Sequence, residues 1–468
     1  MPKSPSHSTL DNRKAPWADE TEEVAAREEA VRAQLTIWRQ HLPDLFQKFA
    51  KIPDPRQPRK VRHKAVVLLF YALLAMVFQY PSRRDANRNA TSPTLAAALR
   101  EIFPDIDSIP HFDTVERFLE TIPVSAWEDM LEEQIQRLLR QHKVQRFLEL
   151  TGWVVAVDGT QKFARHQPWD PKALRQHQSN GETLYRVYIL EAVLVSTDGL
   201  TLPLMSVFCE NPADASEQTK QDCELKVFRR LAKRLKEWFP KRRWVLVMDG
   251  LYPSGPVFQL CQRNRWDYMI ILKDDSLKTV WEDAEGLRKL DKEGNLRKSH
   301  RWGDRDQSFW WVNDLEYEFK ADGKRRRLRV HLVVCDETWT DPKTGETRHS
   351  RWAWISRHPL SQDNVIARCN QAGRNRWKIE SNILVQKQYG DHYEHAYSYD
   401  WTAMQAWHYC MKLAHLLNVL TLWTTEIGKY LLGWHGYAGA IAFLRNTWTG
   451  RWLQREFFAS VRGETASP

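Results

Sequence analysis

Two short apolar segments, each followed by Asp-Gly, most constrain how this chain can fold. The first, WVVAVDG, covers residues 153–159, and the second, WVLVMDG, covers residues 244–250. A near-continuous apolar run of this length is typical of a strand that is buried on both faces. We therefore predict two buried strands that end at Asp158 and Asp249 and leave both carboxylates at an edge of a sheet.

Either aspartate alone is also explained as part of a turn, because Asp-Gly after a strand is a common turn sequence. The surrounding segments indicate the fold to which these two strands belong. Strands are expected at 185–196 and 201–210, joined by the hairpin sequence TDGL, followed by an amphipathic helix at 216–239. A short helix at 256–264 and a strand at 267–273 follow the second Asp-Gly segment. This order predicts an α/β fold with a mixed sheet and flanking helices.

The first 150 residues have only helical patterns. A helix is expected at 20–41, with a break at Pro43, and a buried helix over the apolar run 65–78. Five cations precede that buried helix: Arg56, Arg59, Lys60, Arg62 and Lys64. Cations that lead into an apolar helix are typical of a small domain that meets a phosphate backbone, although a solvated turn explains the same cluster.

From residue 276 to 360 the chain becomes polar and rich in tryptophan, with strands expected at 307–313, 328–339 and 350–356. This pattern indicates a β-rich insertion. The expected organisation is a mobile tail at 1–20, a helical DNA-binding region at 21–150, the first part of the α/β core at 151–275, the insertion at 276–360, a helix that completes the core at 361–397 and a C-terminal helical region at 398–468.

The stretch 374–390, RNRWKIESNILVQKQYG, is expected to be a helix with charges on its apolar side. At about 100° per residue, Arg376, Glu380 and Lys387 fall within roughly 40° of one another and divide the apolar face. The opposite side already offers a polar face to solvent, made of Lys378, Ser381 and Asn382. Because buried charge is costly unless it is paired or bound to a metal, this pattern indicates either a working site or a structural salt bridge.

Charge and cysteine usage limit the partners and the compartment. The chain has 69 Lys and Arg against 59 Asp and Glu, a net charge of +10, which favours a polyanionic partner such as nucleic acid. The six cysteines form no CxxC pair and no zinc-site spacing, so a reducing cytoplasm is expected. The N-terminus lacks the apolar core of a secretory signal, and the run 65–78 is too short to span a bilayer. No membrane segment is expected.

Asp158, Asp249 and Glu380 are the carboxylates that a two-metal site needs. Three strands, a helix, a fourth strand, a short helix, a fifth strand and a late helix is the order of the ribonuclease-H-like fold. In that fold, carboxylates of the first strand, the fourth strand and the late helix meet. Hard oxygen ligands suit two Mg²⁺ or Mn²⁺ ions that bridge an in-line phosphoryl transfer. Four other carboxylates compete for such a site: Glu210, Glu217, Asp222 and Glu224.

The chain resembles the bacterial insertion-sequence transposases of the DDE superfamily, of the insertion-sequence-four type. These carry a tyrosine, arginine, glutamate and lysine with two, three and six intervening residues, and Arg376, Glu380 and Lys387 keep the last two spacings. Gly373 stands where that signature has its tyrosine. VDGT at Asp158 and MDG at residues 248–250 match the first and second acidic motifs of the family. The similarity covers roughly residues 45–425.

The resemblance implies roles for these residues. Two Mg²⁺ or Mn²⁺ ions would be bound by Asp158, Asp249 and Glu380, which would catalyse phosphoryl transfer. Phosphates of a DNA end would be bound by Arg376 and Lys387. The DNA-contacting set is expected to extend to further cations and tryptophans: Lys378, Arg374, Arg325, Arg326, Trp310 and Trp311.

Two parts of this set have plainer explanations. The basic turn KRRRLR, residues 324–329, has the composition of a solvated hairpin tip as well as that of a DNA contact. Among 22 tryptophans, any single one, whether Trp302, Trp310 or Trp311, is more commonly part of a core than a platform for a flipped base.

The sequence therefore predicts a cytoplasmic, nucleoid-associated DNA transposase that cleaves element ends and joins them to target DNA. Its expected partners are double-stranded DNA, as terminal inverted repeats and as target, and a second copy of the chain in a homodimer on DNA. Two other classes stay open. One is a domesticated DNA-binding protein without catalysis, and the other is a host nuclease or resolvase of the same fold.

Overall fold

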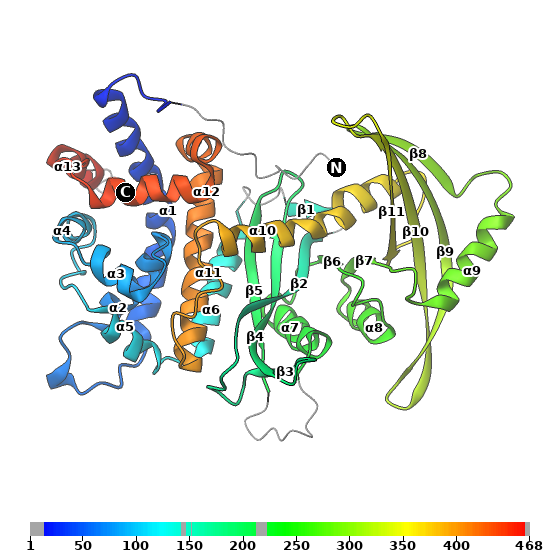
Figure 1. Cartoon of the computed structure of the whole chain (residues 1–468), viewed down its shortest axis with the longest axis horizontal. Helices are drawn as coiled ribbons and strands as arrows, with labels where there is room; N and C mark the ends of the chain where they lie inside the picture. The colour runs from blue at the N-terminus through cyan, green and yellow to red at the C-terminus, as the bar shows by residue number, and fades with distance from the viewer. Residues whose placement is uncertain (1–13, 142–146, 151, 212–221, 464–468) are drawn as a thin grey trace.

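The computed structural model describes residues 14–141, 147–150, 152–211 and 222–463. Residues 1–13 of the expected tail lie outside this description. A helical region forms one end of the molecule, and a large mixed sheet with flanking helices extends to the other end (Figure 1). This arrangement agrees with the expected α/β class.

The helical region combines both ends of the chain (Figure 1). Its N-terminal helices are α1 (Glu20–Lys51), α2 (Ala65–Val77), α3 (Arg83–Asn89), α4 (Pro93–Ile102), α5 (Phe112–Leu119) and α6 (Val124–Leu138). Its C-terminal helices are α11 (Trp401–Thr424), α12 (Glu426–Thr449) and α13 (Arg455–Gly463). All residues of α2 from Val67 to Val77 are buried, which makes this helix the centre of the helical core.

Helix α1 continues through Pro43, where the sequence predicts a break. A proline inside a helix removes one backbone donor and crowds the preceding turn. Leu42 and Leu45, on either side, are buried in the helical core at 2% and 1% exposure. The apolar packing of this side of α1 therefore outweighs the local cost of the proline.

Within the described residues, the sheet has 11 strands, with the main order β3-β4-β2-β6-β7-β11-β10-β9-β8, while β1 pairs with β2 and β5 pairs with β4. Strands β2, β6 and β7 are parallel, and the other neighbours are antiparallel. Their bounds are β1 (Leu148–Glu149), β2 (Gly152–Arg165), β3 (Leu174–His177), β4 (Thr183–Val195), β5 (Thr201–Cys209), β6 (Trp244–Met248), β7 (Asp267–Ile271), β8 (Arg297–Trp302), β9 (Arg305–Ala321), β10 (Lys324–Thr340) and β11 (Thr347–Ser356).

Helices cover the two faces of the central strands with two separate apolar cores. Helices α7 (Glu224–Trp238) and α8 (Gly255–Asn264) lie on one face, and α10 (Trp377–Gln388) lies on the other. Along β2, Val155 and Val157 pack with the α7 and α8 side, whereas Val154 and Ala156 pack with the α10 side. This alternation decides the direction of every side chain that follows on the strand.

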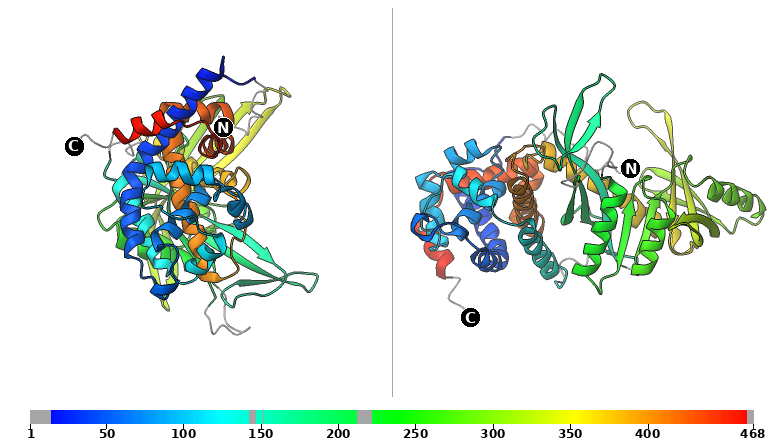
Figure 2. Two further views of the ribbon diagram at one scale, coloured as in Figure 1. Left: turned by 90° about the vertical axis from the view of Figure 1, so that its left-hand side faces the viewer. Right: turned by 90° about the horizontal axis from the view of Figure 1, so that it is seen from below.

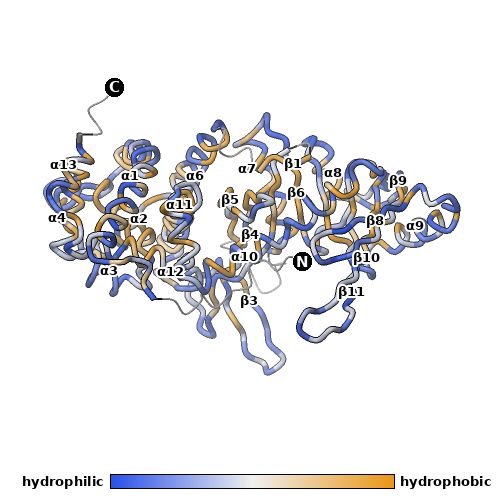
Figure 3. Tube along the Cα trace, turned by 90° about the horizontal axis from the view of Figure 1, so that it is seen from above, coloured by the Kyte–Doolittle hydropathy of each residue, from blue (hydrophilic) through white to orange (hydrophobic). Residues whose placement is uncertain are grey.

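The strands of the expected insertion continue the same sheet. Strand β11 pairs antiparallel with β7, and β10, β9 and β8 follow it outward, with α9 (Lys278–Leu290) alongside β9. The β3–β4 and β10–β11 hairpins project on the same side of the molecule (Figure 2). Apolar residues gather in the central strands and the packed helices, while the projecting hairpins are mainly hydrophilic (Figure 3).

Strand β2 does not end at Asp158 as predicted. It continues to Arg165 and pairs with β4 from Val155 to Arg165, with a register shift between Gln161 and Phe163. The partner strand satisfies the backbone groups beyond Asp158, so the strand persists where the apolar pattern stops. Strand β6, in contrast, ends at Met248, directly before Asp249. Among the described helices, none combines the length and the apolar character that crossing a bilayer requires.

Candidate active site

Asp158 and Asp249 hold equivalent positions on two neighbouring parallel strands. In the β2–β6 ladder Val157 pairs with Met248, so the two aspartates come next in register. Neighbouring strands lie about 4.8 Å apart. Both aspartates continue the alternate set of residues that packs on the α10 side. Asp158 thus faces the α10 side. Asp249 follows the end of β6, and its Oδ1 accepts a hydrogen bond from the Leu251 amide at 2.9 Å. Its charge acts on Asp158, so the two carboxylates lie near each other.

Glu380 is connected to Asp158 by Arg376. A π-helical segment (Ala367–Ala372) and a 3-10 turn (Gly373–Arg376) lead into α10, which is shorter than the expected helix over 374–390. Arg376 Nη1 lies 3.4 Å from Asp158 Oδ2, and Arg376 Nη2 lies 2.5 Å from Glu380 Oε1. The Arg376 side chain is 4% exposed, whereas that of Glu380 is 43% exposed. A buried guanidinium thus bridges the two carboxylates.

The electrostatics of the site centre on Asp158. Burial raises the pKa of its carboxyl group to about 6, Arg376 acts against this rise, and the charges of Asp249, Glu380 and Glu224 add to it. The lowering of this pKa by one guanidinium is therefore smaller than the combined increase caused by burial and by three neighbouring carboxylates. The ionised site needs more positive charge than Arg376 supplies.

Glu224 is the competing carboxylate whose charge acts on Asp158. It is the first residue of α7, and its carboxylate accepts hydrogen bonds from the hydroxyls of Tyr188 (2.5 Å) and Tyr252 (3.2 Å). A Cβ on Gly159 would lie 2.5 Å from Glu224 Oε1, so the glycine of the first Asp-Gly makes room for it. Glu224 approaches from the α7 side of the sheet, opposite α10.

The remaining competing carboxylates have partners elsewhere. Glu210 Oε1 accepts hydrogen bonds from Trp401 at 2.6 Å and from Gln405 at 2.7 Å. Asp222 pairs with Arg230 at 2.5 Å. Glu217 lies outside the described residues.

In the described part of the chain, no group of three or more His, Cys, Asp or Glu side chains is arranged to hold a metal ion. Arg376 lies between Asp158 and Glu380 and supplies the positive charge there. The donor set still fits Mg²⁺ or Mn²⁺ by its chemistry, because it consists of carboxylate oxygens that raise the pKa of Asp158. Arg376 contacts one oxygen of each carboxylate, Asp158 Oδ2 and Glu380 Oε1.

The two lysines of α10 donate to backbone carbonyls, one directly after β4 and one in β2. Lys378 donates to the carbonyl of Ser196, and Lys387 Nζ donates to the carbonyl of Gln161 at 2.9 Å. Lys387 Nζ also pairs with Glu394 at 2.9 Å. Both lysines therefore help to seat α10 on the sheet in this structure, and their contact with DNA stays a prediction.

The expectation that Asn382 faces solvent is wrong. Its side chain is 8% exposed and donates to Thr201 Oγ1 at 2.6 Å. Asn382 also lies 3.1 Å from His415 Nε2, on α11. The C-terminal helix α11 covers this side of α10, which a helical wheel drawn from the isolated segment does not reveal. Ser381, from the same predicted face, is exposed.

Arg374 is buried in an ion cluster that joins the start of the α10 segment to β10. Its guanidinium pairs with Glu337, which also pairs with Arg305 at 3.0 Å. The Arg374 side chain is 5% exposed and lies between the rings of Trp302 and Trp352, at 4.7 and 5.2 Å. In this structure Arg374 holds β10 and the helical segment together instead of facing solvent.

The other predicted DNA contacts lie away from the acids. Arg326 donates to Gln259 of α8, on the face opposite α10, and Arg325 is exposed beside it near the β9–β10 turn. Trp310 and Trp311 are 3% and 2% exposed, so neither ring is open to a base here. Their burial reflects their place on β9, where both faces of the sheet are covered.

Gly373, which departs from the family signature, is explained by a neighbouring tryptophan. A Cβ at this position would lie 2.9 Å from Nε1 of Trp354. Trp354 is fully buried on β11 and packs in the α10-side core. A tyrosine at position 373 therefore has no room unless Trp354 moves.

Lys273 is a cation near the acids that the sequence did not single out. It follows β7, the parallel neighbour of β6, and its aliphatic stem passes beside Gly250: a Cβ there would lie 2.6 Å from Lys273 Cε. The sequence contains a sign of this position, because a lysine two residues after a buried parallel strand lies at the same sheet edge as Asp249. Only the strand order, in which β7 is the neighbour of β6, brings Lys273 next to Gly250.

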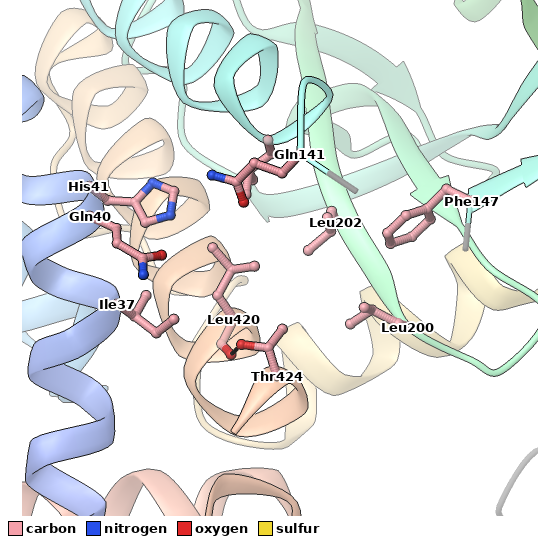
Figure 4. A pocket seen from close by; sticks show the side chains of 10 residues that line it. Ile37, Gln40, His41, Gln141, Phe147, Leu200, Leu202, Leu420 and Thr424 are labelled. Atoms are coloured by element: carbon pink, nitrogen blue, oxygen red, sulfur yellow. Dashed lines mark hydrogen bonds between the residues drawn. The ribbon is translucent and has the colours of Figure 1, made fainter. Parts of the chain in front are cut away.

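Two hollows lie outside this site. One, of about 20 Å³, lies between α1, α6, α11 and the β4–β5 turn, and His41 and Leu420 line it (Figure 4). It has room for about one water molecule. The second, of about 420 Å³, is an open groove over β8, β9 and β10, lined by Ser299, His300, Arg301, Asp306, Gln307, Ser308, Asp336 and Thr338. None of the acids of the site lines either hollow.

Comparison with known families adds one finding. Residues 46–134 match the family model described as DDE_Tnp_1-associated, which points to a DDE-type transposase family. The matched segment extends from the last turns of α1 to α6, within the helical region. A search of curated proteins found no matching sequence. The match suggests a transposase-related function and a nuclease-type enzyme.

Proposed function

We propose that this chain is a DNA transposase of the insertion-sequence-four type, with a ribonuclease-H-like core that cleaves element ends and joins them to target DNA. The observation that carries the proposal is the register of β2 and β6, in which Asp158 and Asp249 directly follow a pair of opposed residues on neighbouring parallel strands. Glu380 reaches the same place and shares Arg376 with Asp158. The DDE_Tnp_1-associated match in the helical region supports the same class.

Asp158, Asp249 and Glu380 would hold two Mg²⁺ or Mn²⁺ ions. When bound, these ions would activate the attacking oxygen and neutralise charge on the leaving oxygen. They would also supply the positive charge that burial and the neighbouring carboxylates make the site require. Arg376, released from one of its two carboxylates, could then donate to a phosphate oxygen of the DNA.

The proposed partners are double-stranded DNA and a second copy of the chain. The net charge of +10 favours association with a polyanion. The Glu380 side chain is 43% exposed, which supports access to the site from the α10 side. The β3–β4 and β10–β11 hairpins project together on one side of the molecule (Figure 2). DNA would approach from this side, with Lys273, Lys378 and Lys387 as nearby cations.

The decisive experiment mixes the purified protein with Mg²⁺ and DNA that carries the inverted repeats flanking its reading frame. Asp249→Asn and Glu380→Gln are expected to bind this DNA as the wild type does but to lose cleavage at the repeat ends, because each removes a hard oxygen ligand. Asp363→Asn, an exposed carboxylate before the same helical segment, is the matched control and should cleave normally.

Binding without metal-dependent cleavage by the wild type would contradict the proposal. It would favour a DNA-binding protein in which Arg376 forms only a structural salt bridge. Cleavage without preference for the repeat ends would instead favour a host nuclease of the same fold.

Metal binding should depend on pH through Asp158. Because its pKa is raised to about 6, Asp158 is protonated below that pH and competes poorly for a cation, whereas above it the carboxylate is free to bind. The increase in melting temperature caused by Mg²⁺ is therefore expected to be full near pH 8 and to shrink as the pH falls through 6. Thermal unfolding with Mg²⁺ or with EDTA measures it. An increase that stays constant from pH 5 to 8 would argue against Asp158 as a ligand.

A further inference from the structure

A buried lysine connects the strand beside Asp158 with the helix that carries Glu380. Lys412, on α11, pairs with Glu191 (Nζ to Oε1, 2.7 Å) and donates to Gln386 Oε1 at 2.9 Å. Glu191, on β4, is the register partner of Asp158. Gln386 lies on α10, the helix of Glu380. Lys412 therefore contacts the strand next to Asp158 and the helix that carries Glu380.

The charges of this link are almost completely removed from solvent. Glu191 is 1% exposed and Lys412 is 0% exposed. Glu191 also accepts hydrogen bonds from Ser206 Oγ at 2.7 Å and from the Tyr393 hydroxyl at 2.8 Å. Desolvation of two charges is costly, and such pairs are weak stabilisers in comparison with apolar groups of the same size. A fully bonded pair of this kind instead favours one relative position of the parts that it joins.

The link continues along α10 into the helical region. Gln386 donates to Asn382 Oδ1 at 2.5 Å, and Asn382 lies 3.1 Å from His415 Nε2. His415 Nδ1 lies 2.7 Å from Asp391 Oδ2, and Gln79 Nε2 donates to Asp391 Oδ1 at 2.8 Å. Gln79 follows α2, inside the segment that matches the transposase-associated family model. A continuous set of buried polar groups thus ties α10 to both β4 and the helical region.

We propose that Lys412 is a positioning residue for the site of Asp158, Asp249 and Glu380. It holds α10 at a fixed place over β4 and thereby sets the distance between Glu380 and Asp158. Through His415 and Asp391 the same contacts make that distance depend on the docking of the helical region. The role in catalysis rests on the proposed function, whereas the positional role of Lys412 does not.

A single replacement of Lys412 would remove the ion-pair partner that lies 2.7 Å from the buried Glu191, so loss of folding could account for any effect. The double variant Lys412→Met/Glu191→Gln removes both charges. Its new amide oxygen can accept from one of the two hydroxyls, Ser206 or Tyr393, and its amide nitrogen can donate to the other. We expect it to stay folded, to bind DNA with an unchanged KM, and to cleave with a kcat lowered by about 10²-fold, the effect of a misplacement of about 1 Å. Backbone amides of α10 should also exchange their hydrogens faster in this variant than in the wild type, while the exchange of the β6 amides stays the same.

A matched control is Glu128→Gln, which alters a buried carboxylate that pairs with Arg234 and accepts from Tyr409, away from α10. It should lower the melting temperature and leave kcat unchanged. Recovery of the wild-type kcat in the double variant, or unchanged hydrogen exchange in α10, would overturn the positioning role. If the wild type cleaves no DNA, the proposed function fails, and the exchange measurement alone still decides whether Lys412 positions α10.

Discussion

Replacement of Asp158 by asparagine is expected to lower metal-dependent DNA cleavage by about 10³-fold or more while making the metal-free protein more stable. The loss of activity follows from the removal of a charged oxygen ligand at the centre of the site. Asparagine has nearly the same shape, so the β2–β4 register and the contact with Arg376 should persist. Cleavage of end-containing DNA under single-turnover conditions measures the first effect.

The gain in stability follows from the pKa of Asp158. Its carboxyl group has a higher pKa in the folded protein, about 6, than in an unfolded chain, so ionisation disfavours the folded state. This penalty grows as the pH rises from about 4 through 6 and then stays constant, with an upper bound of about 3 kcal/mol. Asparagine carries no charge and removes the penalty.

Urea unfolding in EDTA at pH 5 and pH 8 tests this effect. The gain in stability of the variant over the wild type should be about half as large at pH 5 as at pH 8. Asp283→Asn, an exposed carboxylate on α9, is the control and should change stability by less than about 0.5 kcal/mol at either pH. A variant that is less stable than the wild type at pH 8 would contradict the assignment of Asp158 as a strained, functional carboxylate.

Replacement of Glu337 by glutamine is expected to be the most destabilising single charge change in the β8–β11 part of the sheet. Glu337 is buried, and its carboxylate pairs with Arg374 and Arg305 and accepts hydrogen bonds from Gln307 at 2.7 Å and Ser350 at 3.0 Å. Burial by itself raises its pKa, but these four donors outweigh burial and lower it. Without the carboxylate, two largely buried guanidinium groups lose their counter-ion, which costs about 3–5 kcal/mol.

Equilibrium unfolding in urea at pH 7 measures this loss, with Glu318→Gln as the control. Glu318 also pairs with an arginine, Arg327, but both side chains are exposed, and such pairs contribute about 0–1 kcal/mol. Because the pKa of Glu337 is lowered, its contribution to stability is present at neutral pH and is lost as the pH falls through that lowered pKa. A loss below about 1 kcal/mol would mean that Arg305 and Arg374 find other partners.

Several parts of the fold were predictable because they depend on neighbouring residues. The apolar runs before Asp158 and Asp249 predicted two buried strands, and both exist as parts of β2 and β6. The wheel over 374–390 predicted inward charge at Arg376, Glu380 and Lys387. The Arg376 side chain is 4% exposed and that of Lys387 is 20% exposed, whereas that of Glu380 is 43% exposed. In each case the spacing of apolar residues carries the information, since it decides which face of an element must be buried.

Other features depended on which strands and helices meet. The length of β2 beyond Asp158 is decided by its pairing with β4, and the helical path through Pro43 by the packing of α1. The expected solvent face at Asn382 is covered by α11. Local sequence patterns do not identify these partners, because the partners lie far away in the chain.

The candidate site divides in the same way. The residues Asp158, Asp249 and Glu380 could be selected from the sequence, because two apolar runs that each lead into Asp-Gly, and a glutamate on the apolar side of a helical wheel, are local signals. Only the tertiary structure decided that β2 and β6 are in register, that Arg376 lies between Asp158 and Glu380, and that Arg374 is held by Glu337. Strand register and buried ion pairing are set by contacts between segments that are distant in sequence, and no periodicity along the chain encodes them.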